Sequence, residues 1–283
     1  MVVISESDLG LCRELAIPRG SLFEFTSRFL TANKLQPLLA LYALQQAVSS
    51  IPRMPVDDAV KWAKLKWWSE ELAAEPDAPS RHPVLRVLQQ SGVREHLSAD
   101  LLQGLVKDAV IEMDPAADNN IDAMFVRLAA SGETGLLLEM ALDDAAVDTE
   151  NLRYLSAASG LYAYISNFSS DHWAEYQSLP LDVLAQFDVS RQSLQQQPAS
   201  DELSKIIVFL ANRADKWYQQ GLSGLHVSGG PGACAHLQLR WAMENRRLLE
   251  IRKNAKHLLH PGKSYGPSDA WFAWRLSRRL GRS

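Results

Sequence analysis

Cysteine is scarce in this chain of 283 residues, where only Cys12 and Cys234 occur, far apart in the sequence. Two such residues cannot form a disulfide framework and have no metal-ligand spacing, so a reducing compartment is the simplest interpretation. No apolar run reaches the roughly 18 residues that a membrane-spanning helix needs. The first ten residues lack a basic segment followed by a long apolar run, so we expect no signal peptide. These absences together predict a cytoplasmic protein.

The chain also lacks an excess of either charge, because 29 Lys and Arg face 33 Asp and Glu, for a net charge of -4. This balance gives no general attraction to nucleic acid, and we expect no nucleic-acid partner. Hydrophobic residues make up 47% of the chain, which is ordinary for a globular protein with a sizeable core. With no internal repeat in sight, we expect one domain over residues 1–283.

Alternating strand patterns are almost absent, whereas apolar residues recur at the three- and four-residue spacing of helices. The chain is therefore predicted to be all-helical. The predicted helices cover residues 21–29, 38–50, 58–75, 84–90, 99–112, 121–140, 152–170, 201–220, 234–259 and 268–280. The glutamine-rich run 191–200 is predicted to be a surface loop.

Particular residues indicate where helices begin, end or approach one another. Pro37 suits the start of the second helix, Pro52 blocks its continuation, and Asp57 is a candidate N-cap for the next one. Gly132 and Gly135 lie three residues apart within the predicted helix 121–140. Because each glycine costs a helix about 1 kcal/mol, we expect another helix or a ligand close to them.

A pair of carboxylates, Asp171 and Glu175, follows the apolar helix that begins before Gly160. Residues four apart leave the same side of a helix, so the two side chains could hold a divalent metal through oxygen ligands. The same spacing also fits two solvated acids at the point where a helix leaves the core. From spacing alone, this simpler interpretation is favoured.

Several motifs in this order resemble those of the squalene/phytoene synthase family, enzymes that join two prenyl diphosphates head to head. The matching segments are Ala40–Leu44, Glu70–Leu72, Ser131–Gly135, Ser166–Asn167, Asp171 with Glu175, Ser178–Pro180 and Leu184–Ser190. The resemblance implies an all-α isoprenoid-synthase-type helical bundle. It also implies a central cavity between the helices that end near Ser50 and Asp171.

The sequence departs from the family pattern at the first acidic motif, which would fall on Ser49, Ser50 and Arg53. In the family, two acidic clusters hold the magnesium ions that bind the diphosphate. Only Asp171 and Glu175 remain as implied metal ligands, and Ala174 replaces the middle acid between them. The implied ligand-binding residues are Tyr42, Gln46, Ser49, Ser50, Arg53 and Asn167, with Gln46 at a position where the family has an arginine.

Two hypotheses for the function follow from this resemblance. The first is a non-catalytic member, similar to the complex I assembly-factor branch of the family, that binds a lipid or prenyl ligand or a protein partner without a cofactor. The second is an active prenyltransferase of the phytoene or squalene synthase type that uses Mg²⁺. A carrier of prenyl chains is a third possibility. Ser49, Ser50 and Arg53 favour the first hypothesis, and Arg53 could itself bind an anionic head group.

The C-terminal segment combines aromatic and basic residues, with Trp271 and Trp274 followed by Arg275, Arg278, Arg279 and Arg282. Such a helix can lie at a membrane surface, or it can dock its aromatic residues on the core and leave its arginines in water. We expect docking, with Trp271 and Trp274 buried. Peripheral contact with the inner face of the membrane stays open as the alternative.

Overall fold

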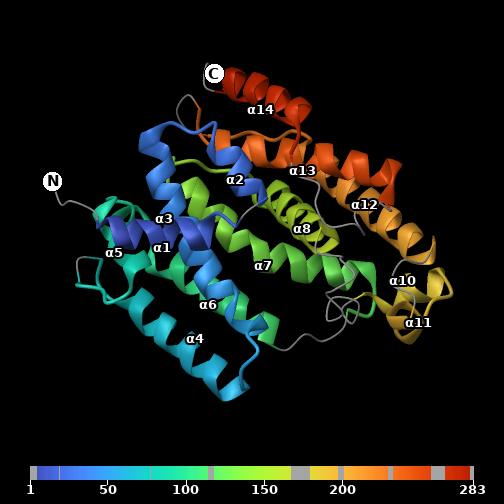
Figure 1. The fold of residues 1–283 in the computed structure, drawn as a ribbon, viewed down its shortest axis with the longest axis horizontal. Coiled ribbons are helices and arrows are strands. Elements are labelled where there is room, and N and C mark those ends of the chain that lie inside the picture. Colours follow the sequence, from blue (N-terminus) through green and yellow to red (C-terminus); the bar gives the residue numbers. More distant parts are fainter. Residues whose placement is uncertain are drawn as a thin grey trace.

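The computed structural model describes residues 5–18, 20–76, 78–113, 118–166, 179–196, 201–228, 232–255 and 265–280. Within these ranges there is no strand, only an isolated bridge between Ala146 and Ser228. The all-helical prediction is thus confirmed (Figure 1). The helices are α1 (Glu6–Ala16), α2 (Leu22–Ser27), α3 (Ala32–Ser49), α4 (Asp58–Ala73), α5 (Pro83–Gln90), α6 (Ala99–Met113), α7 (Ile121–Ala141), α8 (Thr149–Ser166), α10 (Leu181–Gln186), α11 (Arg191–Gln196), α12 (Asp201–Leu222), α13 (Ala235–Lys253) and α14 (Pro267–Leu280), with 3₁₀ turns at Ile51–Arg53 (η1) and Arg94–His96 (η2).

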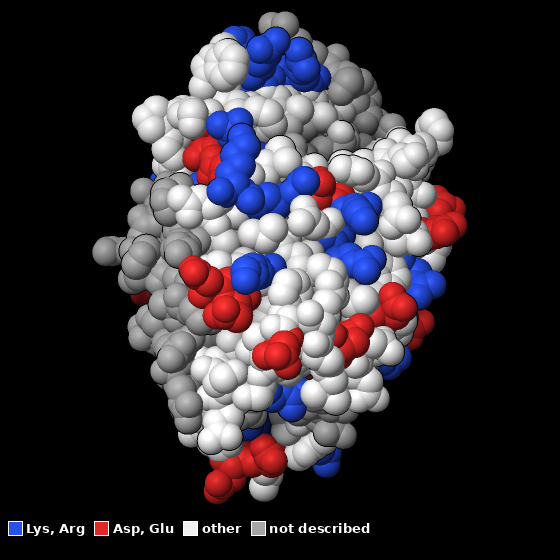
Figure 2. Space-filling view, turned by 90° about the vertical axis from the view of Figure 1, so that its right-hand side faces the viewer, with Lys and Arg blue, Asp and Glu red and all other residues white. Residues whose placement is uncertain are grey.

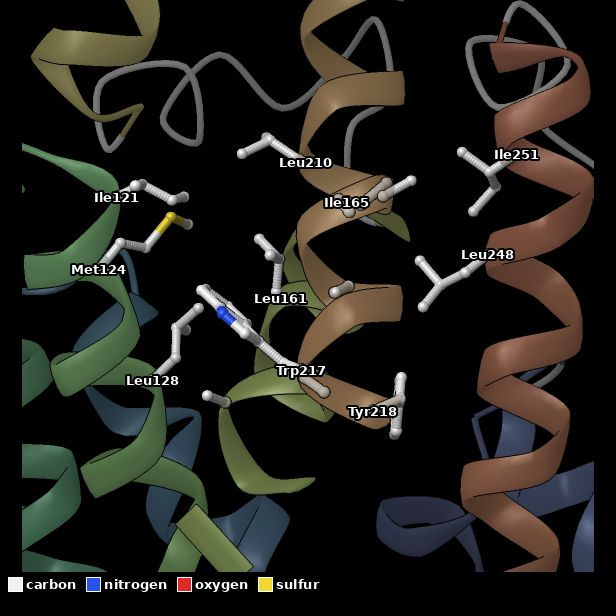
Figure 3. Close-up of a cluster of buried hydrophobic side chains, with 14 of the residues drawn as sticks. Ile121, Met124, Leu128, Leu161, Ile165, Leu210, Trp217, Tyr218, Leu248 and Ile251 are labelled. Carbon is white, nitrogen blue, oxygen red and sulfur yellow. The ribbon is translucent and has the colours of Figure 1, made fainter. Parts of the chain in front are cut away.

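Two large apolar clusters hold the helices together. The first joins α1, α3, α4, α5 and α6, and α3 contributes Leu41, Leu44 and Val48 at helical spacing. The second joins α7, α8, α12 and α13 (Figure 3), where Trp217 and Tyr218 of α12 lie among leucines and isoleucines of the other helices. Fully burying one such side chain contributes about 1.5–3 kcal/mol, so these clusters fix the positions of α3, α7 and α8.

The structure corrects four details of the sequence prediction. Helix α1 was not expected, and α11 replaces part of the predicted loop 191–200. Helix α3 begins at Ala32, so Pro37 lies inside it and removes only one early hydrogen bond. The spacing of Trp62 with Leu65, Trp68 and Leu72 predicts one shared apolar face, but Trp62 is 49% exposed whereas the other three are buried.

Helix α14 docks differently from the expectation. Its Ala273 is fully buried against Phe25 of α2 and Met243 of α13. Trp271 and Trp274 are 59% and 48% exposed, so the prediction of their burial is wrong. The small side chain of Ala273 lets α14 approach α2 and α13 closely. With this face of the helix against the core, both tryptophans point outward. In the described part of the chain, no helix has the length and apolar character needed to cross a membrane.

Candidate functional site

A cavity of about 440 Å³ lies between α3, α6, α7, α8 and α13. This confirms the expected cavity lined by the α3 and α8 helices. Most of its walls are apolar, and polar groups gather at a few points. The described lining residues are Leu22, Phe23, Tyr42, Gln45, Ser49, Leu105, Asp108, Ala109, Glu112, Ser131, Gly132, Gly135, Leu136, Ser156, Ser159, Gly160, Tyr162, Ala163, Arg240 and Glu244.

Both glycines singled out from the sequence lie where helices meet beside the cavity. A Cβ atom on Gly132 would lie 2.6 Å from Oγ of Ser156 on α8, which is too close for any side chain. A Cβ atom on Gly135 would lie 3.4 Å from Nε2 of Gln45 on α3, an ordinary contact. The predicted close approach is confirmed at Gly132, where glycine lets α7 pack against α8.

One polar end of the site is a buried group built around Glu139 of α7. Its Oε1 lies 2.5 Å from Nδ1 of His236, and its Oε2 accepts a 2.8 Å hydrogen bond from the hydroxyl of Tyr42. On its other side, His236 contacts Thr26 through Nε2 at 2.9 Å. Burial alone would raise the pKa of Glu139, but His236, Arg240 and Tyr42 stabilise its carboxylate and lower the pKa below its ordinary value.

Arg240 of α13 extends this group across the cavity wall. It donates a 2.7 Å hydrogen bond to the hydroxyl of Tyr42, and its Nε lies 3.4 Å from Oε1 of Glu244. The other oxygen of Glu244 accepts hydrogen bonds from Tyr218 and, at 2.7 Å, from Ser159. Burial raises the pKa of Tyr218, and Glu244 raises it further. Each charge in this wall therefore has a fixed partner.

The opposite wall carries acids with weaker pairing. Asp108 and Glu112 of α6 both line the cavity. Burial raises the pKa of Asp108 to about 7, against a hydrogen bond from Thr134 that lowers it, and Glu112 raises it further. Oδ2 of Asp108 is buried without a hydrogen-bond partner. Glu112 meets Arg53 at 3.3 Å, although the side chain of Arg53 is 71% exposed.

The structure brings together only some of the residues predicted for the site. Tyr42 and Ser49 line the cavity, whereas Gln46, Ser50 and Arg53 are not among its lining residues. The neighbouring Gln45 occupies the position expected of Gln46.

The remaining three predictions, Asn167, Asp171 and Glu175, lie outside the described residues, so the proposed metal ligands stay a prediction. Within the described ranges, no group of three or more histidine, cysteine, aspartate or glutamate side chains could hold a metal ion.

Sequence reasoning missed most of the charged residues that line or support the cavity. The sequence spacing could have indicated two pairs of neighbouring side chains. Asp108 and Glu112 lie four residues apart in one predicted helix, and Arg240 and Glu244 lie four apart in another. Nothing in the sequence could join Glu139 to His236, because 97 residues separate them and only the tertiary fold brings their side chains together.

Comparison with known proteins places this arrangement in a family. The squalene/phytoene synthase family model matches residues 19–277. The chain belongs to the squalene/phytoene synthase family. It is 26% identical over 237 residues to a phytoene synthase of Rhodobacter capsulatus. The aligned region covers 80% of this chain and 68% of that protein. The sequence-based resemblance to the family is thereby confirmed.

Solved structures show the same fold. A dehydrosqualene synthase crystallised with a ligand has a TM-score of 0.76 and 14% identity, over 98% of this chain and 97% of its own. The squalene synthase HpnC of Alicyclobacillus acidocaldarius has a TM-score of 0.68 and 16% identity, over 90% of this chain and 96% of its own. The expected isoprenoid-synthase-type helical bundle is confirmed.

Family membership raises the question of whether the α3 wall can hold Mg²⁺. This ion takes oxygen ligands in octahedral geometry and is bound in proteins chiefly through carboxylates. The motif resemblance in the sequence places the family's first acidic motif on Ser49, Ser50 and Arg53, which offer two hydroxyls and a cation. Only Ser49 reaches the cavity, so this set does not fit a magnesium ion.

Proposed function

We propose that this protein is a non-catalytic member of the squalene/phytoene synthase family that holds a lipid or prenyl chain in its cavity. The observation that carries the proposal is the α3 wall, where Ser49 reaches the cavity and Arg53 turns out to solvent. Without carboxylates there, a leaving diphosphate would lose charge stabilisation worth several kcal/mol, and each 1.4 kcal/mol is about tenfold in rate.

The charges around the described cavity support the same proposal. Its lining holds Asp108, Glu112 and Glu244, against Arg240 as the one cation among the described lining residues. Arg240 is already bound to Tyr42 and Glu244 and lies 3.8 Å from Glu139. A diphosphate entering this site would meet more acidic than basic side chains and no free cation among the described lining residues, whereas an uncharged apolar chain would not be repelled.

The shape and chemistry of the cavity favour a bound ligand over an empty scaffold. Its volume falls within the range of about 300–1,000 Å³ typical of small-molecule sites, which combine apolar walls with a few polar groups. Leu105, Leu136 and Phe23 supply apolar surface, and Ser131 and Gln45 supply polar contacts. This fits an isoprenoid alcohol or another neutral lipid with a small polar end.

The second candidate function is an active prenyltransferase that depends on Mg²⁺. It is favoured by the match to a phytoene synthase over 80% of the chain. An assay separates the two. The protein is incubated with farnesyl or geranylgeranyl diphosphate and Mg²⁺ or Mn²⁺, and we expect no condensation product. Product formation that Asp171→Ala abolishes would show that the site works and that the proposal is wrong.

Ligand binding is tested with farnesol as the probe and with one pair of variants. Ala163→Trp adds bulk at the rim of the cavity, and Ala59→Trp adds the same bulk on the exposed part of α4. We expect farnesol binding to fall at least tenfold in Ala163→Trp and to stay unchanged in Ala59→Trp, as measured by titration calorimetry. Equal binding by both variants, or no binding by the unmodified protein, would contradict a cavity ligand.

A further inference from the structure

Helix α14 presents an outward face made of two tryptophans and three arginines. At 100° per residue, Trp271, Trp274, Arg275, Arg278 and Arg279 fall within one arc of the helix. All five are exposed. The guanidinium carbons of Arg275 and Arg278 lie 5.4 Å and 5.2 Å from the ring centres of Trp271 and Trp274. Aromatic and cationic groups are thus interleaved on one surface, which we call the α14 face.

The other side of α14 is firmly docked, so the α14 face has a fixed orientation. Ala273 packs against α2 and α13, and Asp269 is 4% exposed. Asp269 accepts a 2.9 Å hydrogen bond from Arg246 and another from the backbone N–H of Gly266. The exposed tryptophans therefore lie on the side of α14 that faces away from its docking contacts.

The charge on the α14 face is free to act on a partner. The ion pairs that α14 makes within the described chain use Asp269, and none of them uses Arg275, Arg278 or Arg279. Figure 2 shows Lys and Arg gathered in the upper part of one side of the molecule, where α14 lies in Figure 1, and Asp and Glu gathered lower down. On this side of a protein with net charge -4, the described basic residues are therefore concentrated near α14.

We propose that the α14 face docks on the surface of an anionic phospholipid membrane. Tryptophan prefers the boundary between head groups and acyl chains, and basic side chains are attracted to negatively charged head groups within a Debye length. A partner protein would need a groove to cover two tryptophans, whereas a lipid surface accepts both from a convex helix. The charge and the convex shape thus point to the same occupant.

The α14 face adjoins the cavity. Leu22 lines the cavity and also packs in the cluster under α14. Tyr265, just before α14, stacks on Phe25 at 4.5 Å and shares a hydrogen bond with Tyr162, which lines the cavity. Docking at α14 would place the α2 side of the cavity next to the lipid. The docking itself does not depend on whether the cavity holds a ligand.

Vesicle co-sedimentation of the full chain tests the proposal. The probes are vesicles of phosphatidylcholine alone and with about one third phosphatidylglycerol. We expect binding to the anionic vesicles that weakens with salt, since the attraction is screened. Each arginine near an anionic surface raises the partition coefficient about fivefold. The combined variant Arg275→Glu, Arg278→Glu and Arg279→Glu should therefore lower the partition coefficient at least tenfold.

A matched control comes from α4, which also exposes tryptophans and lysines. Trp62→Ala with Lys64→Glu and Lys66→Glu removes the same kinds of group from another surface and should leave binding unchanged. Trp271→Ala with Trp274→Ala should weaken binding to both vesicle types, without lowering the melting temperature. Full binding by the triple arginine variant, loss of binding in the α4 variant, or no binding by the unmodified protein would overturn the proposal.

Discussion

The two walls of the cavity are built on different principles. On the α13 side, Glu139 and Glu244 are held by Arg240, Tyr42 and neighbouring hydroxyls in one group of hydrogen bonds and ion pairs. On the α3–α6 side, Asp108 keeps a buried oxygen without a hydrogen-bond partner, and Glu112 pairs with an exposed arginine. On the α13 wall every charged side chain has a partner of opposite charge, although Nε of Arg240 makes no hydrogen bond. On the α3–α6 wall a carboxylate oxygen of Asp108 is left without a partner.

This difference separates structural charge from charge available to a ligand. Buried ionic groups persist only when their partners are in place, so the α13 wall is expected to be rigid and intolerant of substitution. Ser49 in the α3–α6 wall, and Ser50 next to it in sequence, stand where the motif resemblance implies acids, yet the core beneath is intact, with Val48 and Ile51 buried. The departure from the family pattern thus lies where the fold does not depend on the side chain.

The largest effect that would test this contrast is expected from Arg240→Met. Removing the cation leaves Glu139 and Glu244 buried with one partner fewer, which typically costs about 3–5 kcal/mol. The matched variant on the other wall is Arg53→Met. Its side chain is 71% exposed and its pair with Glu112 is worth less than about 1 kcal/mol. Chemical denaturation of both variants measures the difference, and similar losses would refute the contrast.

A smaller effect is expected where α7 crosses α8. Gly132→Ala would place a Cβ 2.6 Å from Oγ of Ser156 and should cost about 1–3 kcal/mol through overpacking. Gly135→Ala meets Gln45 at an ordinary distance and should be neutral or stabilising by up to about 1 kcal/mol, since alanine favours helices.

A second substitution checks that the cause is this one contact. In the Ser156→Ala background the clashing oxygen is gone, so Gly132→Ala should lose most of its cost in thermal melts. Persistence of the full cost would place the strain elsewhere.

The sequence predicted the fold well because helical periodicity and ordered motifs are local signals. Ala40–Leu44 and Ser131–Gly135 sit on α3 and α7, as their resemblance to the family implied. The sequence prediction was wrong for Trp271 and Trp274, because a helix with both aromatic and basic residues can turn either its aromatic or its other face toward the core. The orientation of α14 follows instead from the packing of Ala273, whose small side chain contributes little to a hydrophobic pattern.

The site was harder to predict than the fold. Motif matching pointed to Ser49 and Tyr42, and these do line the cavity. It could not reveal the pairing of Glu139 with His236, since tertiary contacts between distant helices leave no local pattern. The Asp108–Glu112 spacing was visible, but a four-residue spacing of acids is common on solvated helices, and only burial gives it meaning.

The smallest expected effect is a pH dependence at Asp108. Burial raises the pKa of this carboxyl to about 7, above its ordinary value, so the folded state holds the proton more tightly than the unfolded state. Its contribution to stability is full below about pH 4 and is lost as the pH rises through about 7. Asp108→Asn mimics the protonated form.

Since the side chain is only partly buried, we discount the shift and expect the variant to gain about 1–2 kcal/mol at pH 8 and nothing near pH 4. Glu112→Gln removes a neighbouring negative charge, which should lower the pKa of Asp108 and shrink that gain. Denaturation curves at both pH values measure it. A gain of equal size at pH 4 and pH 8 would show that the Asp108→Asn substitution acts through packing and not through the protonation of Asp108.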